Sequence, residues 1–280
     1  MEGRFSFINQ FDKYNNKLYN TKHGFRELNG REEQYRRFLF YKYFYYNSKP
    51  LIVTEGKTDI LYIKAALKNM YNDYPELIEK DEHGFYNFKI SFLRRNDRIN
   101  YFFGVGQDGA DSMQNLFKYF SPEKSKEKGF IDYYSYFNNL CGYLPINPIV
   151  LVFDNELENK KKPLSKFINY IGFTENDKKD LEKILYANIK SNSNLFLTTF
   201  PLVENKKECE IEDLFAKSVL EVKINGKKFT RQDKYDNSQY YGKDMFSKYI
   251  INHYNEIDFT NFKPLLNNIK RILELYNESI

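Results

Sequence analysis

The sequence predicts an α/β fold with a mostly parallel sheet of about four strands flanked by helices. Short apolar runs next to Pro or Gly alternate with stretches whose apolar residues recur at helical spacing. The 280-residue chain is long enough for a large core, and 41% hydrophobic with 29% charged residues is typical of a globular protein. Roughly 18 consecutive apolar residues would be needed to span a membrane, and no stretch reaches that length. With no secretory signal pattern either, we expect a soluble, cytoplasmic protein.

The N-terminal region, residues 1–49, is polar and aromatic, and we expect it to form a helical arm without a closed core of its own. Within it, Arg31–Tyr41 carries apolar residues on one helical face. Residues 50–280 are expected to form one domain with insertions and a C-terminal helical extension.

The expected strands are short, apolar and rich in β-branched or aromatic residues, and they are Pro50–Thr54, Tyr101–Val105, Pro148–Phe153 and Asn194–Thr199. Residues 75–100 are ambiguous, with a strand at Phe88–Leu93 left open. The expected helices are Asp59–Tyr71 behind a Thr58 cap, Ala110–Phe120, a helical region over Leu164–Lys190, a short helix near Ile211–Phe215, Lys243–Ile251 and Phe262–Asn277. Residues 121–147 are expected to be a loop insertion.

Acidic residues follow three of the expected strands. Glu55 follows the first, Asp154 and Glu156 follow the third, and Glu212 and Asp213 come some distance after the fourth. Ligands of open α/β sheets bind at the carboxyl ends of the strands, so we expect these side chains to converge there. For Asp154 and Glu156 alone, an ordinary polar turn is the alternative, and for Glu55 the alternative is a helix-capping role.

Carboxylates crowded at one edge repel each other unless a cation lies among them. The sequence therefore predicts an oxygen-ligated Mg²⁺ or Mn²⁺ site. Only two Cys and three His occur, without metal-ligand spacing, which excludes a Cys- or His-rich zinc centre and a disulfide scaffold.

Two glycine motifs raise the question of a nucleotide cofactor. Glu55–Thr58 contains the tail of a phosphate loop, but Leu51 stands where that motif needs Gly. Gly104–Gly109 matches the dinucleotide pattern GxGxxG, but no convincing strand ending in an acid follows about 20 residues later. We therefore expect no dinucleotide cofactor; a tight turn beside a metal or phosphate fits these glycines as well.

Charge and aromatic content allow a nucleic-acid partner without demanding one. The net charge is +5, and the 25 Tyr and 26 Phe suit a packed core first and base stacking second. Lys243, which opens an expected helix, is a candidate for neutralising a phosphate in a transition state. A solvated lysine at the helix start is the alternative.

Three motifs in this order resemble a TOPRIM domain: Thr54–Asp59 (TEGKTD), Val152–Glu156 (VFDNE) and Ile211–Phe215 (IEDLF). The chain is most similar to the C-terminal TOPRIM region of retron reverse transcriptases. The further segments that carry this likeness are Leu61–Leu67 (LYIKAAL), Ile224–Phe229 (INGKKF), Tyr241–Lys243 (YGK) and Glu2–Gln10 (EGRFSFINQ), the last resembling the stretch that joins polymerase to TOPRIM.

The resemblance implies metal-dependent chemistry on nucleic-acid phosphodiesters, as in related topoisomerases, primases and OLD-type nucleases. It implies that Glu55 is a metal ligand or general acid/base, and that Lys243 stabilises transition-state charge. The metal ligands it implies are Asp154, Glu156 and Glu212, with Asp213 assisting.

Two departures from the family pattern matter. The family usually has Asp-x-Asp where this chain has Asp154-x-Glu156, and the Tyr-x-Asp-Asp signature of the polymerase is absent from the sequence. We therefore expect a Mg²⁺-dependent nuclease acting on DNA or RNA, the effector of a retron-like anti-phage system, and not a reverse transcriptase by itself. The alternative is a catalytically weak module that binds nucleic acid or a partner reverse transcriptase with its RNA–DNA hybrid. The sequence leaves open whether the chain forms a homo-oligomer.

Overall fold

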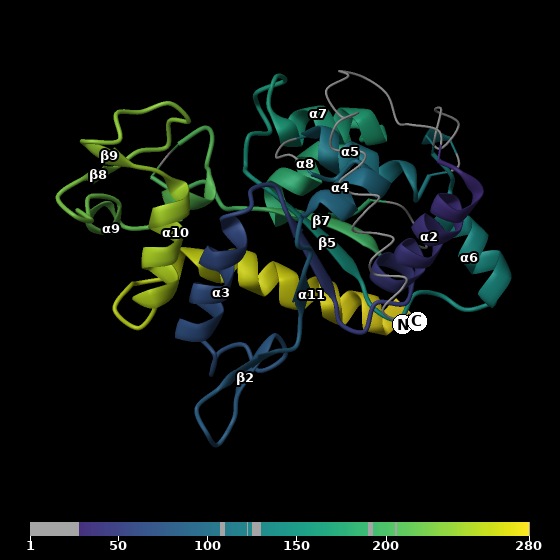
Figure 1. Ribbon diagram of the computed structural model, residues 1–280, viewed down its shortest axis with the longest axis horizontal. Helices are drawn as coiled ribbons and strands as arrows, with labels where there is room; N and C mark the ends of the chain where they lie inside the picture. The colour runs from purple at the N-terminus through teal and green to yellow at the C-terminus, as the bar shows by residue number, and fades with distance from the viewer. Residues whose placement is uncertain are drawn as a thin grey trace.

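The centre of the molecule is a five-stranded sheet with the strand order β4-β1-β5-β7-β6 (Figure 1). The computed structural model describes residues 28–106, 110–121, 123–124, 130–189, 193–204 and 206–279. The strands are β1 (Leu51–Thr54), β4 (Ser91–Phe92), β5 (Ile149–Phe153), β6 (Tyr186–Asn188) and β7 (Leu195–Thr199). The first four in spatial order run parallel, and β6 is antiparallel to β7. The prediction of an α/β fold with a mostly parallel sheet is confirmed.

Both faces of the sheet are buried, which explains why its central strands are continuous apolar runs. Every residue of β1, β5 and β7 is buried. Successive side chains point to opposite faces, so Leu151 packs into one hydrophobic cluster while Val150 and Val152 pack into the other.

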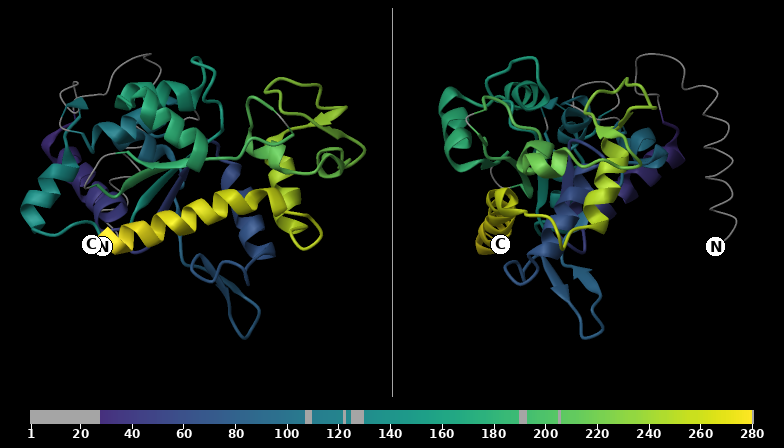
Figure 2. Two further views of the ribbon diagram at one scale, coloured as in Figure 1. Left: turned by 180° about the vertical axis from the view of Figure 1, so that it is seen from behind. Right: turned by 90° about the vertical axis from the view of Figure 1, so that its left-hand side faces the viewer.

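Two sets of helices cover the two faces (Figure 2). The first face packs against α2 (Gly30–Phe40), a π-helical turn (Tyr41–Tyr45), α4 (Asp97–Phe103), α5 (Ala110–Lys118), α6 (Tyr133–Cys141), α7 (Pro163–Ile171) and α8 (Glu175–Ile184). The second packs against α3 (Asp59–Asn69), α10 (Lys243–Asn252), a short 3₁₀ turn (Thr260–Phe262) and α11 (Lys263–Ser279). The left view of Figure 2 shows α11 crossing this second face.

Smaller elements lie beside the sheet. The antiparallel hairpin of β2 (Ile78–Lys80) and β3 (Tyr86–Phe88) extends from the body near α3 (Figure 1). The remaining elements are the 3₁₀ helix η3 (Ile211–Leu214), α9 (Lys217–Leu220), and the paired β8 (Lys228–Phe229) and β9 (Tyr240–Tyr241).

The predicted strand at Tyr101–Val105 is wrong, because most of this segment belongs to α4. Asn96 caps that helix by accepting a hydrogen bond from the backbone N–H of Ile99, and Gly104 ends it with a φ of 66°. A left-handed residue at this position favours glycine. Gly104 is therefore a helix cap and does not follow a strand, so the dinucleotide pattern loses its structural setting. Gln107–Gly109 lie outside the described residues.

The structure answers one open alternative and changes three other expectations in part. The open alternative at Phe88–Leu93 contains β4, which is the sheet's edge strand beside β1. The expected loop insertion contains α6, and the end of the expected helical region Leu164–Lys190 contains β6. Thr58 stands at the cap position of α3, but its side chain makes no capping hydrogen bond there.

The described part of the expected N-terminal arm packs into the first face of the sheet. Leu39, Phe40, Phe44 and Tyr45 are buried in the same cluster as the strand residues. The segment Glu2–Gln10, which contributed to the family resemblance, lies outside the described residues. Among the helices that the structure describes, none combines the length and apolar character needed to cross a membrane.

Candidate functional site

The sheet has a topological switch point between β1 and β5. From β1 the chain passes over α3 to β4 on one side, and β5 pairs with β1 on the other side. Crevices at such points are the usual ligand sites of open α/β sheets. Glu55 directly follows β1, with its backbone N–H bonded to the carbonyl of Val152, and Asp154 directly follows β5.

A two-residue bridge brings a third segment to this edge. Asn155 and Cys209 exchange backbone hydrogen bonds of 2.9 Å in both directions. The Asn155 amide also donates to the carbonyl of Phe200 at 2.7 Å. Beyond the bridge, the backbone N–H of Ile211 donates to Asp154 Oδ1 at 3.3 Å. The start of η3, and with it Glu212, is thereby held beside the end of β5.

The turn between β1 and α3 adds a fourth carboxylate, that of Asp59. Its Oδ2 accepts the backbone N–H of Gly56 at 2.7 Å, and Thr54 Oγ1 donates to the Gly56 carbonyl at 2.7 Å. A Cβ atom at position 56 would lie 2.6 Å from Asp59 Oδ1, so this close approach requires glycine. Asp59 is buried as a result.

These carboxyl groups shift one another's pKa. Burial, then the charges of Glu156 and Asp59, raise the pKa of Glu55 to about 7. Burial and the charge of Glu212 raise the pKa of Asp59 to about 6. Burial, followed by Asp59, Glu55 and Glu212, raises the pKa of Asp154 well above its ordinary value. The predicted convergence of Glu55, Asp154 and Glu212 is therefore present, and we call them, with Asp59 and Glu156, the acidic edge.

Glu156 and Glu212 have basic partners. Lys162 Nζ lies 2.6 Å from Glu156 Oε1, and Lys243 Nζ lies 3.2 Å from Glu212 Oε2. Burial raises the pKa of both carboxyl groups in spite of these partners. Tyr62 donates its hydroxyl to Glu212 Oε1 at 3.4 Å.

Lys243 lies at the first position of α10, which packs against α3. It also contacts Glu210 Oε2 at 3.3 Å. Burial lowers the pKa of Lys243, but the carboxylates of Glu212 and Glu210 outweigh burial and raise it. Lys243 is thus a fixed cation beside the acidic edge, which agrees with its expected place near the site.

Asp213 is not part of this group in the structure. Its Oδ1 contacts Lys206 at 2.9 Å and Arg231 at 2.8 Å, and its Oδ2 accepts the backbone N–H of Glu210 at 2.9 Å. Burial alone would raise the pKa of Asp213, but the bonds to Arg231 and Lys206 lower it. Both oxygens are engaged in holding η3, and the expected metal role of Asp213 stays a prediction.

The donor chemistry of the acidic edge fits a hard divalent cation. Oxygen ligands are those that Mg²⁺ and Mn²⁺ prefer. Glu55 Oε2 and Glu156 Oε2 are buried without a hydrogen-bond partner, which leaves two oxygens that a cation would satisfy. Across the described parts of the chain, however, no three Asp, Glu, His or Cys side chains already stand in metal-binding arrangement. A cation would therefore draw the carboxylates together.

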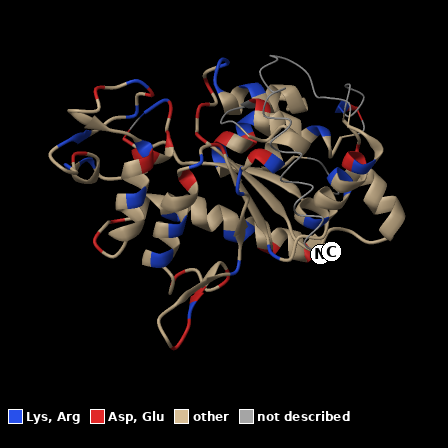
Figure 3. Ribbon diagram, viewed as in Figure 1, with Lys and Arg blue, Asp and Glu red and all other residues tan. Residues whose placement is uncertain are grey.

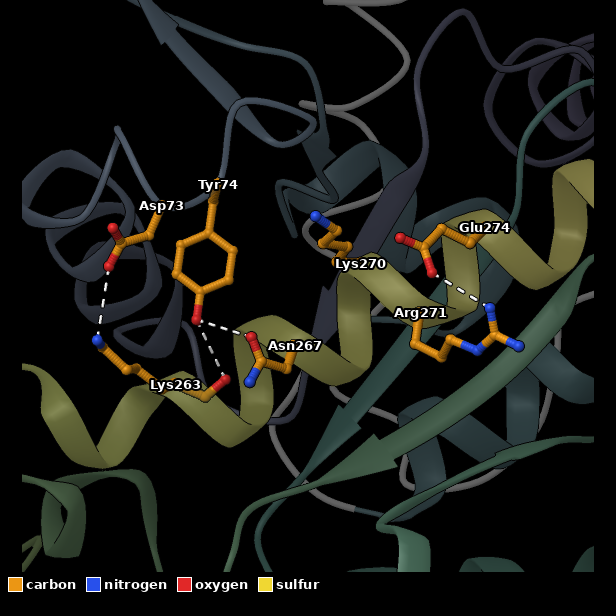
Figure 4. Close-up of a pocket in the computed structure, with 7 residues that line it drawn as sticks. All are labelled: Asp73, Tyr74, Lys263, Asn267, Lys270, Arg271 and Glu274. Carbon is orange, nitrogen blue, oxygen red and sulfur yellow. Dashed lines mark hydrogen bonds and ion pairs between the residues drawn. The ribbon is translucent and has the colours of Figure 1, made fainter.

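A separate depression of about 470 Å³ lies between α11 and the segment Asp73–Tyr74 that follows α3 (Figure 4). Its charged groups are paired with neighbours: Lys263 with Asp73 at 3.5 Å, Arg271 with Glu274 at 3.2 Å, and Lys270 with Glu76 at 2.5 Å. Tyr74 donates its hydroxyl to Asn267 Oδ1. These are the contacts of a packed surface, and we assign it no function.

Sequence reasoning did not select Asp59 or Glu210 as site residues. Asp59 stands in the TEGKTD motif, four residues after Glu55, and only the Gly56 turn brings its carboxylate back to the strand end. Glu210 lies two residues before Glu212, so the spacing was available as a signal. No family model matches the chain, and no solved structure matches it.

Proposed function

We propose that this chain is a divalent-metal-dependent nuclease with a TOPRIM-like site at the acidic edge. The observation that carries the proposal is the set of buried carboxyl groups at the switch point, whose pKa values rise first through burial and then through the charges of neighbouring carboxylates. Such clusters mark functional sites more often than structural ones. The ordered motifs of the sequence support the same interpretation.

In this proposal Asp154, Glu55 and Glu212 would hold Mg²⁺. Glu156 would become a further ligand by giving up its ion pair with Lys162. When bound, Mg²⁺ would activate a water and neutralise charge on the phosphodiester. In the metal-free chain, burial raises the pKa of Glu55 to about 7, so binding of Mg²⁺ near neutral pH would release a proton from this carboxyl group. Lys243 supplies a fixed positive charge for a phosphate oxygen.

The test is cleavage of single- and double-stranded DNA and RNA with Mg²⁺ or Mn²⁺. Asp154→Asn and Glu55→Gln keep the side-chain size and remove the charge, and each is expected to lower cleavage at least about 100-fold by analogy with the loss of other catalytic groups. The matched controls are Asp233→Asn and Glu82→Gln, two exposed acids away from the edge. Equal cleavage by wild type, both site variants and both controls would refute the proposal.

A second candidate function is a catalytically weak module that binds nucleic acid or a partner reverse transcriptase. Lys162 and Lys243 already neutralise Glu156 and Glu212, an arrangement that also suits an edge which never takes up a metal. This candidate predicts salt-sensitive binding that survives Asp154→Asn, with no metal-dependent cleavage. Co-purification with a separate reverse transcriptase and its RNA–DNA hybrid would place the chain in a retron-like defence system under either function.

A further inference from the structure

Three basic residues gather on the outer side of α3 and the adjoining edge of the sheet. Lys64 and Lys68 are one helical turn apart on α3, where Figure 3 marks the basic positions in blue, and Arg94 follows β4. Within the described residues, no carboxylate lies within 4.0 Å of the charged nitrogens of these three residues, in contrast to Lys162 and Lys243. Burial, followed by the charges of Arg94 and Lys68, lowers the pKa of Lys64. A local excess of positive charge attracts polyanions.

Aromatic rings are interleaved with these cations. Lys64 Nζ lies 5.5 Å from the ring centre of Phe88 and 5.2 Å from that of Phe92. Lys68 Nζ lies 5.5 Å from the ring centre of Tyr86 and 5.2 Å from that of Tyr254. Phe88 and Phe92 meet edge to face with centres 6.3 Å apart. We define the basic–aromatic face as Lys64, Lys68, Arg94, Tyr86, Phe88 and Phe92.

The β2–β3 hairpin places Lys80 on the side of this face and Glu79 on the opposite side. Lys80 pairs with Tyr86 across the hairpin, and its Nζ lies 5.2 Å from the Tyr86 ring centre. The acidic Glu79 pairs with Asn87, and both point to the opposite side of the hairpin because side chains alternate along a strand. Glu79 is held there by Lys89 at 3.0 Å.

Helix α3 and the end of β4 connect the basic–aromatic face with the acidic edge. Helix α3 begins at Asp59 and reaches Lys68 nine residues later, a span of about 14 Å at 1.5 Å per residue. On the sheet side, β4 runs parallel to β1, and Arg95 after it donates to the carbonyl of Thr54, the residue before Glu55. A polymer bound along the face would therefore extend to the carboxyl ends of the strands.

We propose that the basic–aromatic face binds a single-stranded polynucleotide and leads it to the acidic edge, an inference that takes its substrate class from the proposed nuclease function. The lysines would contact phosphates, and the rings would stack on unpaired bases, the combination that proteins use for single strands. A duplex keeps its bases stacked inside and gains only the phosphate contacts. Single strands of DNA and of RNA share this chemistry, and the experiment separates them.

The experiment measures binding without cleavage, using the full chain in EDTA and labelled 20-nucleotide oligo(dT) and oligo(U). Fluorescence anisotropy of wild type is compared with Lys64→Gln/Lys68→Gln and with Phe88→Leu. We expect the double lysine variant to bind about tenfold more weakly and its salt slope to fall by about 1.4, since each lost phosphate contact removes about 0.7. Phe88→Leu is expected to bind several-fold more weakly at an unchanged salt slope. If the double variant fails to fold, binding by the single variant Lys68→Gln is measured in its place.

The matched control is Lys166→Gln/Lys179→Gln, which removes two exposed lysines from α7 and α8 over the other face of the sheet and should bind as wild type. Equal binding by wild type and the double lysine variant would overturn the inference, as would a duplex bound as tightly as either single strand. If the two proteins bind equally and wild type still cleaves, the nuclease proposal holds and only the role of this face is refuted. If single strands bind through this face but are not cleaved in Mg²⁺, the role of the face holds and the nuclease proposal is refuted.

Discussion

Two buried charged clusters in this molecule are built on opposite principles. In the first, Arg36 of α2 contacts Glu33 at 2.5 Å and donates to the hydroxyls of Tyr133 at 3.1 Å and Tyr119 at 3.5 Å. Its guanidinium also lies 5.6 Å from the Tyr119 ring centre and 5.7 Å from that of Tyr133. Here one opposite charge, two hydroxyls and two aromatic rings surround one cation. The cation links α2 to α6 and to the end of α5.

In the acidic edge, by contrast, charges of the same sign face each other. Burial and neighbouring carboxylates raise the pKa of Glu55, Asp59 and Asp154, and two buried carboxylate oxygens have no hydrogen-bond partner. A compensated buried ion destabilises a fold when one of its partners is removed, whereas like charges held together destabilise it unless a ligand joins them. The difference separates a structural cluster from a candidate site within the same fold.

The largest expected effect tests the structural cluster. Arg36→Met should lower the free energy of unfolding by about 3–5 kcal/mol, because Glu33 and two tyrosine hydroxyls lose their buried partner. The control is Arg37→Met, whose neighbour Tyr136 is partly exposed and whose loss should cost less than about 1 kcal/mol. Urea unfolding measures both; similar losses for the two variants would contradict the comparison.

Lys243→Met tests the compensated part of the acidic edge. Glu212 is fully buried, and without Lys243 it keeps the Tyr62 hydroxyl and a backbone hydrogen bond but loses its ion-pair partner Lys243. We expect a loss of about 3 kcal/mol at pH 7.5. Lys248→Met, from the exposed pair with Asp244 on the same helix, should cost less than about 0.5 kcal/mol. A Lys243 variant as stable as its control in thermal melts would show that Glu212 needs no cation.

A bound divalent cation should compensate the negative charges of the acidic edge, so that both clusters would then be compensated. Added at 100 times its dissociation constant, Mg²⁺ is expected to stabilise the folded chain by about 2.7 kcal/mol through binding alone. Calorimetry at pH 7.5 with and without Mg²⁺ measures this gain, and Asp154→Asn should reduce it strongly while Asp233→Asn keeps it. An unchanged melting temperature for wild type across millimolar Mg²⁺ would count against metal binding here.

The smallest expected effect is a gain of stability. Without metal at pH 7.5, Glu55→Gln should stabilise the chain by about 1–3 kcal/mol, since it removes a buried charge whose pKa is raised to about 7. Between the ordinary glutamate pKa and about 7, the folded chain binds more protons than the unfolded chain, so wild-type stability falls as the pH rises through this window. Melting curves at several pH values should show a flatter profile for Glu55→Gln. An identical profile for Glu82→Gln and Glu55→Gln would contradict the assignment.

The parts of the fold that were predictable are those specified by local pattern. The runs Pro50–Thr54, Pro148–Phe153 and Asn194–Thr199 are apolar because β1, β5 and β7 are buried on both faces. Tyr101–Val105 has a similar composition, but its first three residues are the end of α4, since the Asn96 cap and Gly104 decide the conformation there. The strand β4 has two residues and pairs with β1 at the edge of the sheet. This pairing is a tertiary contact, which the local sequence pattern does not contain.

The candidate site was predictable to the extent that it lies at strand ends. Glu55 and Asp154 follow from the rule that parallel strands present their carboxyl ends at one edge. Asp59 comes to the site through a glycine turn, and Lys162 reaches Glu156 across a loop of irregular structure. These side-chain contacts depend on the conformation of loops, which the periodicity of hydrophobic residues along the sequence does not indicate.

The bridge between Asn155 and Cys209 has a consequence for the timing of folding. Glu55 and Asp154 come earlier in the chain than Glu212, which is placed by that bridge, and Lys243, which comes from α10. During synthesis from the N-terminus, the two strand-end acids leave the ribosome well before the residues that complete their surroundings. The acidic edge therefore cannot be complete before Glu212 has been synthesised, and a nascent chain shorter than about 210 residues holds an incomplete site.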